Sequence, residues 1–346
     1  MKKIAVIIGG PSAEHEISLK TGFQIIKNLD KNKYEVSAVA ISKDKKFFFA
    51  QNTKDITQDD IDSFLDSPFF SGKYEACDSL EIWRGIDLAF LALHGEFGED
   101  GTFQGYLQTV GIRYTGCNVV SSAVGMHKIL AKKVFEASGI PTPPYSVYRP
   151  CDGEGKITDD CRIREIIAKY KFPLFVKAPQ SGSSKLMYRV QNESELKAAI
   201  EKLTAYKCKS VLIESGIKGE EFSCPVIEKD GIVTALTPIF IRPKNTEGFF
   251  DYNAKYLGES EEICPPPHSK ETIELLKKTA VAVHKVLECD GYSRTDIILS
   301  DNVGYVLEIN TLPGMTAASL LPQAFAVDGG EFSELLDLIV EDALKP

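Results

Sequence analysis

The amino-acid sequence predicts an α/β protein, with a parallel sheet in its first third and α+β units in the remainder. Apolar runs alternate with amphipathic stretches in the first third, a pattern typical of a parallel sheet covered by helices. Later apolar runs are joined by short turns, as in antiparallel strand pairs. The 346 residues suffice for two or three domains, and we place them at 1–117, 118–213 and 214–346.

In the first domain, "KIAVIIGG" is predicted to be a buried strand. A helix is expected from about Glu14 to Leu29, because Leu19, Phe23 and Ile26 fall on one face. "YEVSAVAIS" and "IDLAFLALHG" are the next strands, and the second is apolar enough to be buried on both sides. Ligands of such sheets gather at the carboxyl ends of the strands, so "GGPSAEHE" and "HGEFGEDG" are expected to line one crevice.

The second domain begins with a predicted helix from about Ser122 to Ser138, which Gly139 and a following proline end. "PTPPYSVYRP" is interpreted as a rigid linker. "FPLFVKAPQSGSSKLMYRV" predicts a strand, a Gly/Ser loop and a second strand. "NESELKAAIEKL" predicts a helix with Asn192 and Glu195 at capping-box positions.

The third domain starts near "SVLIESGIKGEEF", and a hairpin is expected around Lys229–Asp230–Gly231. The loop 243–256 is polar and aromatic without strand or helix periodicity, and its length suits a functional lid. A helix from about Lys270 to Leu287 follows, and then "RTDIILS" and "GYVLEIN" form a second hairpin around "SDNVG".

One face of this last hairpin carries three oxygen-bearing side chains. Glu308 and Asn310 are two residues apart and therefore point to the same side, and Asp296 lies on the partner strand. Like charges opposite each other in a sheet repel, so a cation is expected between them. Hard oxygen ligands suit Mg²⁺, which proteins bind beside substrate phosphates. The alternative is that these acids face solvent.

Several other motifs can be interpreted either as part of a functional site or as residues with only a structural or surface role. Lys177 before a Gly/Ser turn fits phosphate binding, or a plain hairpin. Glu214 and Glu221 fit ribose or adenine contacts, or surface acids. Lys128 alone would be a solvated helix residue. His94 and Glu99, in a glycine-rich segment after a buried strand, fit proton transfer or a structural histidine.

Composition excludes several classes of protein. The composition, 43% hydrophobic and 26% charged, is typical of a soluble globular protein, and the net charge of −9 argues against a nucleic-acid partner. No apolar run approaches the length of a membrane span, and the N-terminus lacks the features of a signal peptide. The eight cysteines form no C-x-x-C pair, which favours a reducing cytoplasm over disulfides or a zinc site.

Seven motifs, in order, resemble those of D-alanine–D-alanine ligases, members of the ATP-grasp superfamily. The resemblance runs from Lys3 to about Leu344. It implies a Rossmann-like N-terminal domain followed by a two-part ATP-grasp fold. The motifs are "GGPSAEHEISL", "HGEFGEDGTFQG", "VKAPQSGSS", "ESGIKGEEF", "YNAKY", "RTDIIL" and "LEINTLPGMTAASLLP".

The resemblance also implies residue roles. Asp296, Glu308 and Asn310 would hold two Mg²⁺ ions, for which Mn²⁺ can substitute. Lys128, Lys177, Ser184 and Lys255 would contact ATP phosphates, and Glu214, Ile217 and Glu221 the adenosine. Glu14 would receive the ammonium of the first D-alanine, with Ser183 and Tyr256 closing beside it. Arg294 and the Gly314 backbone N–H would stabilise an oxyanion, and His94, Ser319 and Leu320 would contact substrate.

The activity implied is ATP-dependent ligation of two D-alanine molecules through an acyl phosphate, for peptidoglycan precursors and cell shape. A cytoplasmic homodimer is implied, with no nucleic-acid partner and no membrane insertion. Tyr256 favours an amine acceptor, because related ligases that use D-lactate often carry Phe there.

The chain departs from the family pattern around the nucleotide, at His127, Ala178, Lys185, Leu186 and Ser215. Two alternatives therefore stay open at this stage. One is a related ligase with D-serine or D-lactate as acceptor, and the other is a nucleotide-binding protein with impaired catalysis.

Overall fold

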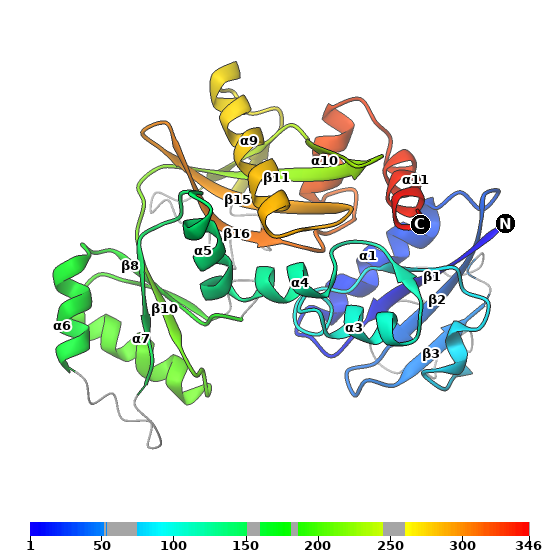
Figure 1. Ribbon diagram of the computed structural model, residues 1–346, viewed down its shortest axis with the longest axis horizontal. Helices are drawn as coiled ribbons and strands as arrows, with labels where there is room; N and C mark the ends of the chain where they lie inside the picture. The colour runs from blue at the N-terminus through cyan, green and yellow to red at the C-terminus, as the bar shows by residue number, and fades with distance from the viewer. Residues whose placement is uncertain (52, 54–74, 151–159, 181–185, 245–259, 346) are drawn as a thin grey trace.

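Three β-sheets organise the protein, and helices cover each of them (Figure 1). The computed structural model describes residues 1–51, 53, 75–150, 160–180, 186–244 and 260–345. The predicted α/β class is confirmed. The first sheet is mainly parallel, and the other two are built from antiparallel pairs.

The first sheet has the strand order β4-β3-β2-β1-β5-β6, and its middle strands are parallel. Helix α1 (His15–Asn28) follows β1 and packs on it through Leu19, Phe23 and Ile26, which are all buried as predicted. Helix α3 (Thr102–Thr109) follows β5. The strands are β1 (Lys2–Gly9), β2 (Tyr34–Ile41), β3 (Phe47–Ala50), β4 (Glu75–Ala76), β5 (Leu88–Leu91) and β6 (Arg113–Tyr114).

The sequence predicted one helix over 122–138, and this is wrong in one respect, because two shorter helices occupy that part of the chain. These are α4 (Val119–Met126) and α5 (Lys128–Ala137), and the chain breaks at His127, whose φ and ψ are −93° and 89°. The His127 ring accepts from the Leu130 N–H at 3.4 Å and caps α5. The Lys128 N–H donates to the Pro179 carbonyl at 2.9 Å, so a contact distant in sequence fixes the break.

The second sheet has the order β7-β10-β8-β9 and carries α6 (Asp160–Lys169) and α7 (Glu193–Ala205), at the left of Figure 1. The predicted linker "PTPPYSVYRP" contains a strand, β7 (Tyr145–Tyr148), which pairs with β10 (Val211–Ser215). The boundary that we placed between 213 and 214 falls inside β10. The other strands are β8 (Leu174–Lys177) and β9 (Met187–Val190).

The expected cap of α7 is present in part. Asn192 accepts from the Glu195 N–H at 3.0 Å, as a capping box requires. The Glu195 carboxylate accepts from the Gln191 N–H at 2.8 Å, one residue before the predicted donor.

The third sheet has the order β14-β13-β11-β15-β16, with β12 beside β11, and α9 (Lys270–Val286) packs on it. Both predicted hairpins are present. Positive φ angles occur at Asp230 and Gly231 in the first and at Asp301 and Asn302 in the second. The strands are β11 (Glu220–Lys229), β12 (Ile232–Ala235), β13 (Ile239–Pro243), β14 (Ser260–Ile263), β15 (Tyr292–Ser300) and β16 (Val303–Asn310).

The expected lid, 243–256, falls almost wholly outside the described residues. Pro243 is the last residue of β13 rather than part of a loop.

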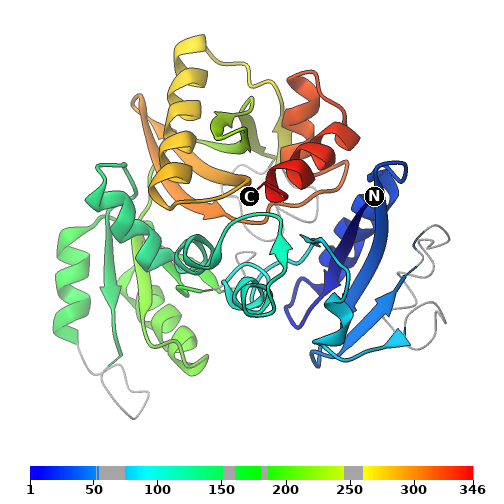
Figure 2. The ribbon, with the colours of Figure 1, turned by 45° about the vertical axis from the view of Figure 1, so that its right-hand side comes forward.

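Helices α10 (Leu320–Val327) and α11 (Phe332–Ala343) bring the chain back to the first sheet, as Figure 2 shows. Arg113 donates to the Lys345 carbonyl at 2.9 Å, and Lys33 pairs with Asp337 on α11. The first and third sheets are thereby joined over one continuous apolar core. No helix in the described ranges is long and apolar enough to span a membrane.

His284 is expected to make folding stability depend on pH. Its side chain is 1% exposed between α9 and β15, and Nδ1 lies 2.8 Å from Ser293 Oγ. Burial lowers its pKa to about 4. The unfolded chain, with a histidine pKa of about 6.5, binds a proton that the folded protein does not. Stability is therefore lost as the pH falls from 6.5 towards 4, by about 2 kcal/mol at pH 5 relative to pH 7.5.

Urea unfolding at pH 7.5 and pH 5 measures this loss. The His284→Gln variant cannot titrate, so it should lose about 2 kcal/mol less than the wild type between the two pH values. Equal losses in the two proteins would contradict the assignment.

Candidate active site

Arg294, Asp296, Glu308 and Asn310 lie together on one face of the β15–β16 hairpin. The register sets Asp296 opposite Glu308 and Arg294 opposite Asn310. Asp296 is only 5% exposed, and its carboxylate accepts from Ser223 at 2.6 Å, from Asn310 at 3.2 Å and from Arg294 at 3.3 Å. The face predicted from the sequence is therefore assembled around a buried carboxylate.

Two cations balance the two carboxylates of this face. Arg294 contacts both oxygens of Asp296, and Lys128 Nζ lies 3.1 Å from Glu308 Oε2. Burial acts to lower the pKa of Arg294, but Asp296 more than offsets this and raises it. The guanidinium therefore stays charged at the bottom of the site.

The donor set fits a divalent cation of the hard, oxygen-binding kind. Asp296, Glu308 and Asn310 supply two carboxylates and one amide on neighbouring strands. Within the described part of the chain no three His, Cys, Asp or Glu side chains form a metal-binding group.

A cavity of about 430 Å³ opens over this face. We call it the larger cavity, because a neighbouring cavity described below has a volume of about 240 Å³. The floor of the larger cavity comes from β15 and β16. One wall comes from α1 and the loops that follow β1 and β5 of the first sheet, and the other comes from the segment leading into α10. Predicted site residues on this lining are Glu14, His94, Arg294, Asp296, Glu308, Asn310, Gly314, Ser319 and Leu320.

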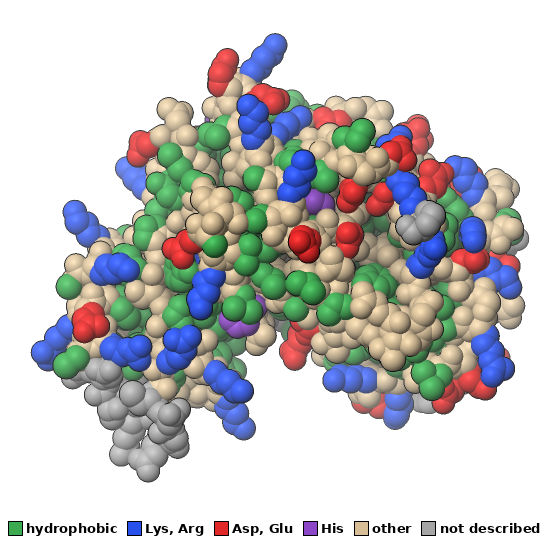
Figure 3. All heavy atoms as spheres, in the orientation of Figure 1, with side chains coloured by type: hydrophobic (Ala, Val, Ile, Leu, Met, Phe, Trp, Pro, Cys, Tyr) green, Lys and Arg blue, Asp and Glu red, His purple; other side chains and the backbone are tan. Residues whose placement is uncertain are grey.

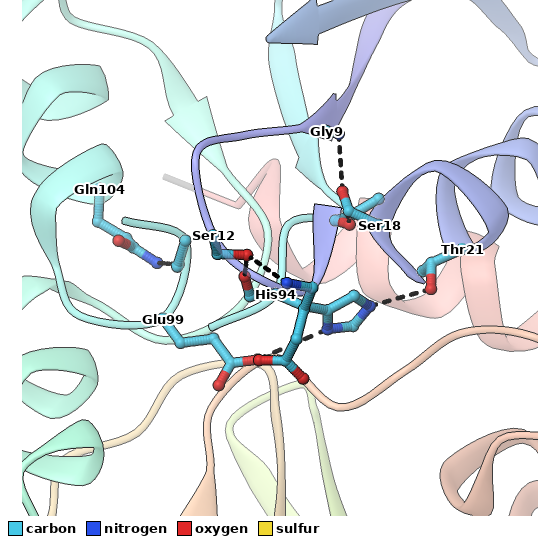
Figure 4. Close-up of polar contacts among 10 residues, drawn as sticks. Gly9, Ser12, Ser18, Thr21, His94, Glu99 and Gln104 are labelled. Atoms are coloured by element: carbon cyan, nitrogen blue, oxygen red, sulfur yellow. Dashed lines mark hydrogen bonds and ion pairs between the residues drawn. The ribbon is translucent and has the colours of Figure 1, made fainter. Parts of the chain in front are cut away.

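Hydrogen bonds fix the first-sheet wall of the larger cavity (Figure 4). Ser12 Oγ donates to the His94 carbonyl at 2.6 Å and accepts from the Glu14 N–H at 3.1 Å. The His94 ring lies 2.9 Å from Thr21 Oγ1 and 3.5 Å from Glu99 Oε1. The loops after β1 and β5 are thus bound to each other, and Glu14 and His94 are held on one wall.

Gly95 is required by the close approach of these two loops. Its φ is +71°, and a Cβ at this position would lie 2.5 Å from Glu14 Oε2. A larger residue would meet both the backbone strain and the Glu14 carboxylate.

The opposite wall ends at the N-terminus of α10. Ser319 is the N-cap residue, and its hydroxyl accepts from the Thr316 N–H at 3.0 Å. A Cβ on Gly314 would lie 2.8 Å from Ser319 Oγ. Gly314, Ser319 and Leu320 line the larger cavity at this helix N-terminus, a position that favours an anionic group.

A second cavity of about 240 Å³, the smaller cavity, lies between the second and third sheets. Its lining includes apolar side chains such as Phe175, Met187 and Phe240, and also seven charged ones, two lysines and five carboxylates. Lys128, Glu221, Ile241, Asp296 and Glu308 line both cavities. A flat apolar ligand with an anionic tail could therefore lie in the smaller cavity and reach the hairpin face.

Glu214 is buried at the inner end of the smaller cavity, between two lysines. Its side chain is 2% exposed, and its oxygens pair with Lys132 at 2.5 Å and with Lys177. Burial acts to raise the pKa of Glu214, but the two ammonium groups more than offset this and hold the pKa below its usual range. Glu214 is therefore an ionised carboxylate at the inner end of the cavity, already paired with protein cations.

Sequence reasoning missed Lys132, Lys20 and Ser223. Lys132 is 1% exposed. Its burial could have been suspected from the sequence, because it lies three residues from each of the apolar residues Ile129 and Phe135, on the same helix face. Lys20 lies on α1 with its side chain on the lining of the larger cavity. Nothing in the sequence alone set Ser223 opposite Asp296.

Of the remaining predicted residues, Lys128, Lys177, Glu214, Ile217 and Glu221 line the smaller cavity. Ser183, Ser184, Lys255 and Tyr256 lie outside the described residues. Among the departures, Ala178, Leu186 and Ser215 line the smaller cavity, and His127 caps α5. Lys185 is also outside the described ranges.

Comparisons with known proteins point to one family along nearly the whole chain. A family model described as "D-ala D-ala ligase N-terminus" matches residues 3–117, and one described as "D-ala D-ala ligase C-terminus" matches residues 134–341. A D-alanine–D-alanine ligase from Clostridium beijerinckii is 40% identical, over 99% of both chains. One from Bacillus anthracis is 37% identical, over 99% of this chain and 97% of the relative.

Solved structures show the same likeness. The D-alanine–D-alanine ligase of Bacillus anthracis complexed with ATP superposes with a TM-score of 0.72 at 34% identity, over 99% of this chain and 98% of that one. The VanG D-Ala:D-Ser ligase of Enterococcus faecalis superposes with a TM-score of 0.84 at 29% identity, over 99% of both chains.

Proposed function

Because the chain belongs to the D-alanine–D-alanine ligase family, we propose that it joins two D-alanine molecules at the expense of ATP. The product would be D-alanyl-D-alanine, a building block for peptidoglycan made in the cytoplasm. The observation that carries this proposal is the meeting of the two cavities at the hairpin face. One cavity suits a nucleotide and the other suits two small amino acids.

In the first step, a carboxylate oxygen of the first D-alanine attacks the γ-phosphorus of ATP. The bond to the β-phosphate oxygen breaks, which gives a D-alanyl phosphate and ADP. Lys128 and Lys177 line the nucleotide side of the hairpin face, where their ammonium groups can bind phosphate oxygens. Glu14 can hold the ammonium of D-alanine on the opposite wall.

In the second step, the amine of the second D-alanine attacks the acyl carbon. The tetrahedral oxyanion collapses, phosphate leaves, and the amine loses a proton. Arg294 and Gly314 both line the larger cavity, and the guanidinium and the Gly314 backbone N–H would stabilise that oxyanion. Lys20 and the N-terminus of α10 can bind the carboxylate of the second D-alanine.

Asp296, Glu308 and Asn310 would hold Mg²⁺, which neutralises phosphate charge in reactions of this type. Lysine and arginine side chains are prominent over the lobe that carries α6 and α7 in Figure 3. In the smaller cavity itself five carboxylates accompany the two lysines, so binding of a polyanionic ligand would depend on Lys128, Lys177 and a bound cation.

A second acceptor is raised by the likeness to a D-Ala:D-Ser ligase at a TM-score of 0.84, although the D-alanine–D-alanine ligase from Coxiella burnetii superposes equally well, at 0.83. D-serine differs from D-alanine by one hydroxyl, and an apolar pocket discriminates weakly against such an addition. The amine acceptor must therefore be identified by experiment.

The proposal is tested by phosphate release from ATP and Mg²⁺ with D-alanine, beside L-alanine and no amino acid. We expect release with D-alanine alone and a product with the mass of the dipeptide. A second series adds D-serine or D-lactate to D-alanine, and mass analysis reports mixed products. ATP binding without phosphate release in any mixture would overturn the ligase proposal.

A further inference from the structure

Lys132 is an unusual feature of the nucleotide side of the molecule. It lies one helical turn after Lys128 on α5, but its side chain is 1% exposed and is absent from the lining of both cavities. Its ammonium group is therefore not among the groups that these cavities present to a ligand.

The surroundings of this ammonium group are tightly defined. Nζ lies 2.5 Å from Glu214 Oε1, donates to Thr142 Oγ1 at 2.5 Å, and lies 5.7 Å from the centre of the Tyr145 ring. Thr142 in turn donates to the Val306 carbonyl on β16 at 2.8 Å. Burial lowers the pKa of Lys132, and Glu214 opposes that effect.

Stability alone does not explain such a pair. Replacing a buried ion pair with neutral side chains of similar size is often neutral or stabilising, whereas removing one partner leaves an uncompensated charge. A lysine is therefore expected here only where its charge acts on something else. The other partner of Glu214 is Lys177, whose side chain is 12% exposed and lines the smaller cavity, the proposed nucleotide site.

We propose that Lys132 is a positioning residue that neutralises Glu214, so that the ammonium of Lys177 remains available to the phosphates of the nucleotide. The three side chains together carry one net positive charge, and only Lys177 presents it to the cavity. Without Lys132, Glu214 and Lys177 would form a closed neutral pair. The inference rests on the proposed nucleotide site, but not on the identity of the amino acids ligated.

The experiment measures binding of ATP and of adenosine by calorimetry, with no amino acid present. In the Lys132→Met variant we expect ATP to bind at least about tenfold more weakly, equivalent to about 1.4 kcal/mol. Adenosine carries no phosphate and should bind as it does to the wild type. Lys133→Met, which removes an exposed lysine from the same helix, is the matched control and should change neither affinity.

A double variant, Lys132→Met with Glu214→Gln, provides the decisive comparison. It removes both buried charges together and leaves Lys177 with its single positive charge, so the ratio of ATP affinity to adenosine affinity should return to within about threefold of the wild type, as expected for coupled residues. The ratio cancels any contact that Glu214 itself makes with the adenosine. A purely structural role for Lys132 would instead weaken ATP and adenosine alike in the single variant, because the uncompensated charge of Glu214 would disturb the whole cavity.

Three outcomes would overturn the proposal. They are unchanged ATP affinity in Lys132→Met, equal weakening of ATP and adenosine, or a double variant no better than the single one. If Lys132→Met does not fold, the wild type is compared with the double variant, and a large loss of ATP affinity in the latter without a matching loss of adenosine affinity overturns the proposal. If the wild-type protein binds no ATP, it is the proposed function that fails.

Discussion

Replacing Arg294 with methionine is expected to lower kcat about 10³-fold, with a much smaller change in KM for ATP. The guanidinium lies on the floor of the larger cavity, held by two 3.3 Å hydrogen bonds to Asp296. A donor fixed in this way needs no reorganisation when negative charge develops on the acyl oxygen, and that accounts for the size of the effect. The loss should therefore appear in the chemical step.

Steady-state phosphate release with ATP and D-alanine measures the change. Arg242→Met is the matched control, because Arg242 is half exposed on β13 of the same sheet, where its guanidinium pairs with Glu261 and lies 5.3 Å from the centre of the Phe240 ring. That variant should retain kcat within about twofold, as surface ion pairs contribute little. Thermal unfolding of both variants separates a folding defect from a catalytic one. A kcat within tenfold of the wild type in Arg294→Met would argue against the oxyanion role.

The hairpin face could be predicted from the sequence because local rules determine it. Glu308 and Asn310 share a face through the two-residue period of a strand, and a short turn brings Asp296 beside them. The structure sets Asp296 opposite Glu308, as that reasoning required. The helix over 270–287 and the strands of the first sheet were equally clear, because their apolar patterns are long and regular.

The errors arose where contacts distant in sequence override local preference. The stretch around His127 has good helix formers on both sides, and the break depends on the hydrogen bond from Lys128 to Pro179. The proline-rich segment before Tyr148 resembles a linker, but pairing with β10 makes it a strand. Such pairings depend on tertiary context, which overrides local propensity.

Glu214 shows the same limit within the site. As a lone acid at the end of an apolar strand, it suited an adenine or ribose contact. The structure pairs both of its oxygens with lysines, one of them from a helix about 80 residues earlier in the chain. The burial of Lys132 could be suspected from its place in an apolar stripe, but its partner could not be identified without the fold.

Glu308→Gln is expected to lower the rate at saturating ATP and D-alanine by more than about 10²-fold. Glu308 is opposite Asp296, pairs with Lys128 at 3.1 Å, and lines both cavities. Changes in residues that only support a metal ligand commonly cost 10- to about 100-fold in affinity or activity, so loss of a direct ligand should cost more.

The Mg²⁺ dependence of phosphate release distinguishes two roles for this carboxylate. If Glu308 binds the cation, its variant needs a higher Mg²⁺ concentration for half-maximal rate, and excess Mg²⁺ restores part of the activity through the remaining amide oxygen. If Glu308 only holds Lys128 in place, KM for ATP rises and the Mg²⁺ dependence is unchanged. Glu261→Gln, at an exposed position on the edge of the same sheet, should leave both unaltered. An unshifted Mg²⁺ curve in Glu308→Gln would remove this residue from the cation site and leave Asp296 and Asn310 as its candidate ligands.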